Sequence, residues 1–193
     1  MATGAGTPIV TDTATFPWLE GRLVGVTGSG SDALDRAFAA LIGEHGPTIW
    51  RVIRSYEPNQ HEREDLYQEI WLAIWKALPS FRGDAQLRTY LLRIAHNRGL
   101  SHRGRTRPRL AALEEADAVV DPRGDTEQAG ERQRELRAAL DRLPAIHREA
   151  VVLRLEGLSS REIAAVLGIT ETNVGVRLLR ARAMLRQLLG DDR

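Results

Sequence analysis

Apolar residues recur at every third or fourth position through most of the chain beyond residue 30. This is the spacing of helices with one buried face, whereas strands would alternate apolar and polar residues, and no useful length of the sequence does so. The pattern therefore predicts an all-α protein. Its breaks predict where the individual helices begin and end.

Four helices are expected in the first half of the chain, at about 31–42, 46–56, 62–78 and 84–102. A Gly-Pro pair opens the second of them, prolines follow the second and the third, and an aspartate can cap the fourth. The segment that precedes them, 1–30, is rich in Gly, Thr, Ser and Ala and has no sustained periodicity. Such a composition is typical of a flexible arm.

Glycines and prolines break the periodicity between 104 and 130, which predicts a flexible linker. The linker separates an N-terminal domain, 31–103, from a C-terminal domain, 131–193. In the C-terminal domain a leucine stripe predicts a first helix, and Pro144 opens a second helix that ends at Gly157. The expected fold is thus two small helical domains joined by a flexible linker.

Beyond Gly157 the sequence contains two helices that can be capped, joined by a glycine turn. Ser159 can cap the first, and Glu162, three residues later, completes a capping box. Gly168 permits a tight reversal, after which Thr170 can cap the second helix. This pattern predicts a helix-turn-helix whose second helix offers polar residues to the major groove of DNA: Glu171, Thr172, Asn173, Arg177 and Arg180. The alternative is an antiparallel helix pair in a small bundle, its arginines forming a solvated face.

Composition narrows the class of protein. The 193 residues are 42% hydrophobic and 27% charged, which is ordinary for a globular protein. The absence of cysteine excludes disulfides, zinc-thiolate sites and thiol redox sensing by this chain itself. The sequence begins with no signal peptide and has no apolar run long enough to cross a membrane, so we expect a cytoplasmic protein without membrane insertion.

The formal net charge is only +1, but the charges are segregated along the chain. Seven arginines and no carboxylate lie between Arg88 and Arg109. A solvated basic face usually includes glutamates that pair with its arginines, and the fourth expected helix has none. We interpret this face as a surface that follows the phosphates of a nucleic acid, formed by Arg88, Arg93, His96 and Asn97 and, just beyond them, Arg103.

The third expected helix carries more aromatic surface than its core stripe needs. Tryptophans beside carboxylates are typical of a surface that binds another protein, because the rings provide affinity and the charges provide register. The residues on this side are Asp65, Gln68, Glu69, Trp71, Leu72 and Trp75. The alternative is that one of the two tryptophans belongs to the core.

No catalytic constellation is evident in the sequence. None of the five histidines has the spacing of a helical zinc site, and there is no glycine-rich phosphate loop. We therefore expect a protein without enzymatic activity, and we expect no cofactor and no metal.

Two blocks of the sequence resemble the sigma factors of bacterial RNA polymerase, specifically the small extracytoplasmic-function (ECF) group. Residues 64–77 resemble the family's polymerase-binding helix, and residues 81–97 resemble its promoter-melting segment. Residues 143–182 resemble the domain that reads the upstream promoter element. The order and spacing of these blocks are highly specific, and the resemblance covers most of residues 31–190.

The resemblance implies a factor that recruits the polymerase core to specific promoters and helps to open the minus-10 region. The acidic and aromatic residues of the third helix would contact the clamp helices of the largest subunit, and the flap of the second-largest subunit would be a further contact. Phe81 and Arg82, with the basic face, would hold a flipped base of the minus-10 element, and the helix-turn-helix would engage the minus-35 duplex. Promoter DNA and an anti-sigma factor would complete the set of partners.

Two other functions compete with this interpretation. A regulator could bind DNA through the same helix-turn-helix without joining polymerase, but the acidic and aromatic face argues against it. A recombinase or nuclease would need a catalytic serine, tyrosine or carboxylate cluster, and the chain shows no convincing one. The promoter sequence stays open, notably because Gly175-Val176 stands where many family members carry a basic and a small polar residue.

Overall fold

The computed structural model describes residues 30–110 and 130–190, and this part of the chain is helical with no strand. The elements are α1 (Gly30–Ile53), α2 (Gln60–Ala77), the 3-10 turn η3 (Leu78–Ser80), α3 (Leu87–Leu110), α4 (Glu131–Arg142), α5 (Ala145–Leu155), α6 (Ser160–Leu167) and α7 (Glu171–Gly190). The all-α, two-domain expectation is confirmed. The expected arm, 1–30, except for its last residue, and most of the expected linker, 104–130, lie outside the described residues.

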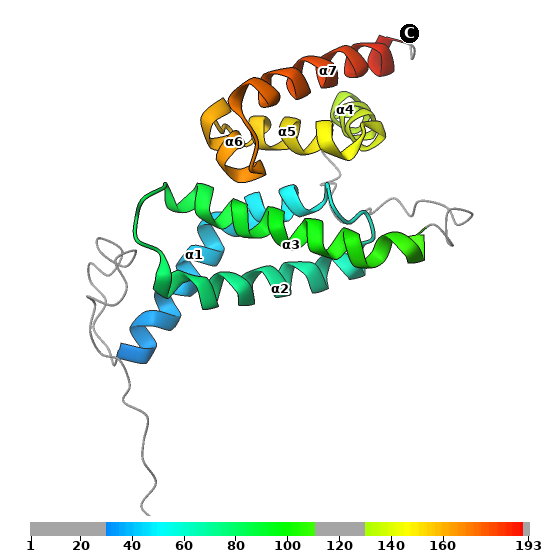
Figure 1. The fold of residues 1–193 in the computed structure, drawn as a ribbon. Helices are drawn as coiled ribbons and strands as arrows, with labels where there is room; N and C mark the ends of the chain where they lie inside the picture. Colours follow the sequence, from blue (N-terminus) through cyan, green and yellow to red (C-terminus); the bar gives the residue numbers. More distant parts are fainter. Residues whose placement is uncertain (1–29, 111–129, 191–193) are drawn as a thin grey trace, which may run out of the picture.

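The helices form two layers (Figure 1). One layer contains α1, α2 and α3, with α2 and α3 side by side in opposite directions. The other layer contains α4 to α7, and α6 lies directly on α3. Helix α3 therefore packs against its own domain on one side and against the C-terminal domain on the other.

The first two expected helices are a single helix, and the predicted break at Gly46-Pro47 is wrong. A proline inside a helix costs about 3 kcal/mol or more, since it removes one hydrogen bond and crowds the preceding turn. The buried side chains on both sides of Pro47 follow one stripe that includes Leu41, Ile49 and Val52. Each contributes about 1.5–3 kcal/mol when buried, so keeping the stripe on one continuous helix outweighs the cost of the proline.

Helix α3 differs from its expected bounds at both ends. It begins at Leu87 rather than near Asp84, and the main-chain oxygen of Gln86 accepts its first hydrogen bond. It continues to Leu110, seven residues into the expected linker. Ion pairs of the final turns with other elements accompany this extension, and their partners are distant in sequence: Arg103 with Glu149 at 3.1 Å and Arg105 with Glu69 at 3.0 Å.

The local signals of the helix-turn-helix are confirmed. The Ser159 hydroxyl accepts from the backbone N–H of Glu162 at 3.2 Å, and the Glu162 carboxylate accepts from the backbone N–H of Ser159 at 2.7 Å. Gly168 ends α6 in the left-handed conformation, with φ of 65°, and the Thr170 hydroxyl accepts from the backbone N–H of Asn173 at 3.2 Å. Each residue satisfies backbone groups that the helix end leaves unpaired.

The two domains are joined by a buried carboxylate. Glu156 follows α5, and its side chain is only 10% exposed. It accepts hydrogen bonds from the Thr48 hydroxyl at 2.9 Å and from the Arg51 guanidinium at 2.8 Å, while Arg88 donates to its main-chain oxygen. Burial alone would raise the pKa of Glu156, but the hydrogen bonds from Arg51 and Thr48, with the charges of Arg51 and Arg88, lower it below its ordinary value.

Further contacts surround this carboxylate. The buried apolar residues of the two domains form one continuous cluster that includes Leu91 of α3 and Ile163 of α6. At the margin, Arg148 donates to the main-chain oxygen of Ser55 at 3.1 Å, and Arg54 pairs with Asp141 at 3.4 Å. The linker thus connects two domains that also share a core.

Replacing Glu156 with glutamine should uncouple the domains. The substitution removes the charge that Arg51 and Arg88 complement, and hydrogen bonds to a charged group contribute about 2 kcal/mol. Three of the four tryptophans, Trp50, Trp71 and Trp75, lie in the N-terminal domain and none lies in the C-terminal domain, so the change in tryptophan fluorescence on unfolding follows the N-terminal domain, whereas circular dichroism follows both. In urea we expect the two signals to share one midpoint in the parent and to separate in Glu156→Gln.

The matched control is Glu171→Gln, which neutralises an exposed carboxylate at the start of α7. It should leave the two transitions coincident. Coincident, unshifted transitions in Glu156→Gln would contradict the role of this carboxylate.

Candidate functional site

Helix α2 presents an acidic stripe with an exposed leucine. Asp65, Gln68, Glu69 and Leu72 follow one another at helical spacing, and all are exposed. The Leu72 side chain is 55% exposed, which is large for a leucine in a small helical domain. An apolar side chain beside carboxylates is the composition expected of a protein-binding surface.

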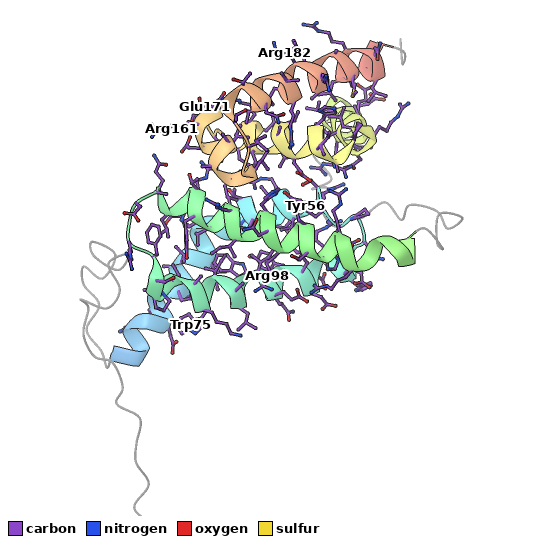
Figure 2. All side chains as sticks on the ribbon, in the orientation of Figure 1. Tyr56, Trp75, Arg98, Arg161, Glu171 and Arg182 are labelled. Carbon is purple, nitrogen blue, oxygen red and sulfur yellow. The ribbon has the colours of Figure 1, made fainter. Side chains whose placement is uncertain are left out.

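The two tryptophans of α2 differ in burial. Trp71 is only 6% exposed and packs edge-to-face against Phe38 and Tyr67, so its placement on the binding face is corrected to the core. Trp75 is half-buried, with its ring 4.7 Å from that of Phe38. Figure 2 shows Trp75 on the side of the N-terminal domain that faces away from the C-terminal domain. The alternative of one core tryptophan is therefore confirmed for Trp71.

In the loop before α3 the polar residues are exposed, whereas the aromatic residue is buried. Phe81 is buried, with its ring 4.8 Å from that of Tyr90, so it belongs to the core and is not available to a base. Arg82 is exposed, and Gly83 beside it has φ of 82°, in the left-handed region. The expectation for Phe81 is thus corrected, while Arg82 remains available.

The basic face of α3 is divided. Arg93 and Asn97 are exposed and one turn apart. Arg88 is half-buried and bonded to Glu156, and Arg103 pairs with the buried Glu149. The acidic partners that the sequence of α3 lacks are thus supplied by α5 and by the residue that follows it.

His96 is buried under the C-terminal domain rather than exposed on the basic face. Its Nδ1 lies 2.6 Å from the hydroxyl of Tyr56, and the Tyr56 ring lies so close to Gly99 that a Cβ there would be 2.5 Å from it. Burial, with the nearby charges of Arg177 and Arg93, lowers the pKa of His96 to about 4. The imidazole is therefore neutral at physiological pH and adds no charge to the basic face.

The second helix of the helix-turn-helix, α7, buries Val174 and Ala181. Four of its candidate DNA contacts are exposed: Glu171, Thr172, Asn173 and Arg180. Arg177, which was expected in solvent, is half-buried, and its charge lowers the pKa of His147 after the effects of burial and Arg180. Glu171 lies with Arg161 at one end of the C-terminal domain (Figure 2).

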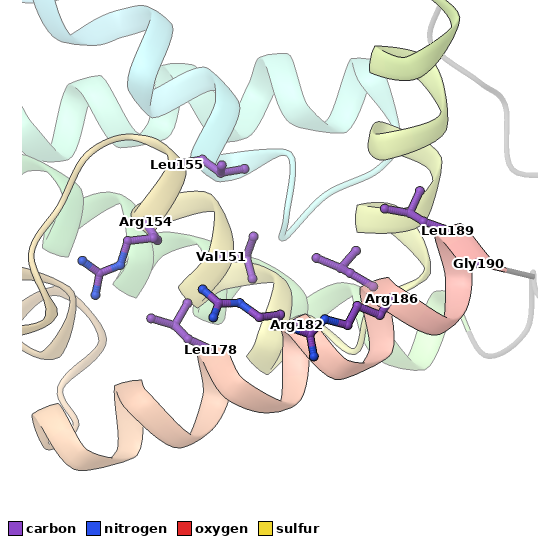
Figure 3. Close-up of a pocket in the computed structure, with 9 residues that line it drawn as sticks. Val151, Arg154, Leu155, Leu178, Arg182, Arg186, Leu189 and Gly190 are labelled. Atoms are coloured by element: carbon purple, nitrogen blue, oxygen red, sulfur yellow. The ribbon is translucent and has the colours of Figure 1, made fainter.

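Sequence reasoning missed a groove of about 620 Å³ between α5 and α7 (Figure 3). Leucines and a valine form its floor, and three arginines line it: Val151, Leu155, Leu178, Leu185 and Leu189, with Arg154, Arg182 and Arg186. Leu155 is 63% exposed. The one feature of the sequence that indicates this groove is Leu155, a leucine just beyond the core stripe of α5. Periodicity alone does not distinguish such a leucine from an apolar residue that is exposed by chance.

Among the described residues, no group of three or more His, Cys, Asp or Glu side chains could hold a metal ion. No helix in the same part of the chain is long and apolar enough to cross a membrane.

Two family models match the chain, one in each of its two domains. Residues 41–109 match the family model of Sigma-70 region 2. Residues 133–185 match that of Sigma-70 region 4. The first match covers α2, nearly all of α3 and the second half of α1, and the second covers most of the C-terminal domain, including the helix-turn-helix.

Two curated relatives are identical to this chain at about a third of the aligned positions. The RNA polymerase sigma factor CnrH of Cupriavidus metallidurans is 36% identical over 169 residues, which cover 81% of this chain and 88% of CnrH. The ECF RNA polymerase sigma factor SigE of Mycolicibacterium smegmatis is 35% identical over 167 residues, which cover 83% of this chain but only 65% of SigE.

Two solved structures resemble the fold. CnrH in complex with the cytosolic domain of CnrY has a TM-score of 0.59 and 31% identity, with 82% of this chain and 91% of that chain covered. The sigma factor RpoE in complex with the anti-sigma factor NepR from Bartonella quintana has a TM-score of 0.65 and 26% identity, with 81% and 98% covered.

The buried His96 should make the protein sensitive to acid. The folded state keeps this imidazole neutral down to pH of about 4, whereas the unfolded chain protonates it near its ordinary pKa of 6.5. Stability present above pH 6.5 is therefore lost as the pH falls toward 4. Between pH 7 and 5 the parent should lose about 2 kcal/mol more than His96→Gln in urea unfolding.

Two features isolate this effect. Burial raises the pKa of Glu149, so this carboxyl favours the folded state as the pH falls, whereas His96 disfavours it. Glu149 is present in both proteins, so its contribution cancels when the two are compared. The control, His61→Gln, changes an exposed histidine and should follow the parent at every pH. A histidine NMR signal for His96 that titrates near pH 6.5 would refute the assignment.

Proposed function

The chain belongs to the ECF family of RNA polymerase sigma factors, and on this premise we propose that it binds the core of bacterial RNA polymerase, directs it to promoters through both domains and helps to open the minus-10 region. It acts without enzymatic activity of its own and in the cytoplasm, where polymerase and promoter meet. The observation that carries the proposal is the combination in one chain of a helix-turn-helix and an exposed protein-binding stripe on α2.

The stripe on α2 is the contact for the clamp helices of the largest subunit. Asp65, Gln68 and Glu69 provide charge and hydrogen bonds, and Leu72 provides apolar surface with the exposed edge of Trp75. The position of Trp75 away from the C-terminal domain supports this assignment, because polymerase can approach α2 while the two domains remain packed together.

The groove between α5 and α7 is the contact for the flap of the second-largest subunit. Its apolar floor fits the apolar face of a helix, and Arg154 of α5 fits a carboxylate on that helix. The relatives CnrH and RpoE form complexes with CnrY and with an anti-sigma factor. We propose an anti-sigma partner for this chain on that likeness.

The DNA contacts divide between the domains. Arg82, Arg93 and Asn97 are exposed and serve the minus-10 element from the start. Arg88 and Arg103 are paired with residues of the C-terminal domain, and His96 is buried, so these three serve the minus-10 element only after that domain has moved. Among the candidate residues of α7, those that engage the minus-35 duplex are Glu171, Thr172, Asn173 and Arg180, whereas the half-buried Arg177 is nearer to the domain junction.

The competing function is a regulator that binds DNA but not polymerase. Such a regulator would not need an exposed leucine among carboxylates on α2. A direct measurement of binding to core polymerase therefore separates the two functions.

Binding to core polymerase should depend on Leu72 and on Leu155. Truncation of an apolar anchor that becomes buried in an interface costs about 2 kcal/mol, or roughly thirtyfold in Kd. Leu72→Ala and Leu155→Ala should each weaken binding by about that factor in a fluorescence titration. The control, Leu136→Ala, removes a leucine that is 39% exposed on α4 and should bind like the parent. Binding of both test variants at parental affinity would leave the competing function as the better one.

Promoter opening should depend on Arg93 and Asn97 after polymerase has bound. Their side chains would contact DNA only, so Arg93→Ala and Asn97→Ala should form the holoenzyme normally. Each should reduce permanganate reactivity of thymines in the bubble by roughly tenfold, which corresponds to about 1.4 kcal/mol. Arg142→Ala, an exposed arginine at the end of α4, serves as control. Normal opening by both test variants on a linear promoter would exclude this face from melting.

A further inference from the structure

Helix α7 carries an exposed stripe that is apolar rather than polar. At the helical spacing, Val176, Leu179 and Ala183 share one side, opposite the buried Val174 and Ala181. All three are exposed, with Val176 at 41% and Leu179 at 69%. Burial inside this chain therefore does not explain why these positions are apolar.

The surroundings of the stripe indicate an anionic partner. Glu171 is the only acidic residue of α7, and the helix carries four arginines, of which three are exposed: Arg180, Arg182 and Arg186. Arg180 lies on one flank of the stripe, and Arg182 and Arg186 lie on the other. Arginines on both flanks match the two phosphate backbones that border a major groove.

A glycine beside the stripe has no role in internal packing. Gly175 is in the interior of α7, where glycine is less favourable than alanine, and a Cβ built there meets no described atom within 4 Å. It precedes Leu179 by one turn and so flanks the same side of the helix. Beside an exposed apolar stripe, such a glycine lets another molecule approach the helix backbone closely.

We infer that Val176 and Leu179 read thymine methyl groups in the major groove of the minus-35 duplex, and that Gly175 lets the helix lie close to the bases. The inference rests on the proposed function and makes it more specific. The C5 methyl of thymine is the apolar group that base edges present in the major groove, so an apolar stripe selects A·T pairs at the positions it reaches. Glu171, Thr172 and Asn173 then account for hydrogen bonds at the start of the helix.

The test uses the full chain assembled with core polymerase. Promoters are first selected from a library that is randomised over the minus-35 element. Each thymine of the selected element is then replaced singly by deoxyuridine, which removes only the methyl group, and the affinity of the holoenzyme is measured by competition. Removal of a methyl that becomes buried against Val176 or Leu179 should weaken binding about fourfold at one or more positions.

The variants identify which side chains are responsible. Leu179→Ala and Val176→Ala should bind promoters with thymine and with deoxyuridine equally well at the positions they contact, and both should fold normally because the two side chains are exposed. Leu136→Ala should keep the fourfold preference. A parent holoenzyme that is indifferent to every deoxyuridine, or variants that keep the parental preference, would overturn the inference while leaving the proposed function intact.

Two other outcomes also decide the matter. Loss of polymerase binding in Leu179→Ala would show that the stripe binds a protein and would overturn the inference. A holoenzyme that selects no upstream sequence at all would overturn the proposed function and the inference with it.

Gly175→Ala provides an independent check. It should raise the thermal midpoint of the free protein and weaken promoter binding severalfold. Gly43→Ala changes another exposed helical glycine with open space around its Cβ, so it should raise the midpoint without changing promoter affinity. Parental promoter affinity in Gly175→Ala would show that the backbone is not approached there.

Discussion

The arrangement of the two domains depends on the hydrogen bonds and ion pairs of the Glu156 carboxylate. A charge taken out of water is costly unless it is paired and hydrogen-bonded, and Glu156 finds Thr48 and Arg51 on α1 and Arg88 on α3. None of these partners belongs to its own domain. Burying the carboxylate therefore fixes the end of α5 against two helices of the N-terminal domain at once, which brings α6 onto α3.

This packing has a consequence for how the chain can meet DNA. Arg88, Arg103 and His96 are engaged by the C-terminal domain or buried beneath it, whereas the stripe on α2 and the outer side of α7 stay exposed. If the engaged residues bind the minus-10 element as proposed, α6 must first move off α3, and the energy for that movement has to come from new contacts with polymerase or DNA. Contacts made through α2 do not themselves require this movement.

The features that could be predicted from the sequence are those decided within a few residues. The capping box at Ser159, the reversal at Gly168 and the cap at Thr170 depend on local hydrogen bonds and backbone conformation, and the structure confirms all of them. The break at Pro47 was wrong because a buried stripe, completed by residues far away in the sequence, outweighs a local breaker. Trp71 and Phe81 were misplaced because the aromatic packing partners of each could not be identified from periodicity.

His96 and the arginines of α3 show a second limit, which concerns charge. A helix with seven arginines and no carboxylate predicts a free basic surface, yet Glu149 and Glu156 supply counter-charges from the other domain and Glu69 supplies one from α2. When a phosphate displaces one of these carboxylates from an arginine, one ion pair replaces another. The number of counterions released is then smaller than when a phosphate binds an arginine that has no carboxylate partner. Arg93 and Arg98 are exposed and have no ion-pair partner within the described part of the chain. The salt dependence of DNA binding is therefore governed by the few arginines without carboxylate partners, and the total positive charge of the helix overstates it.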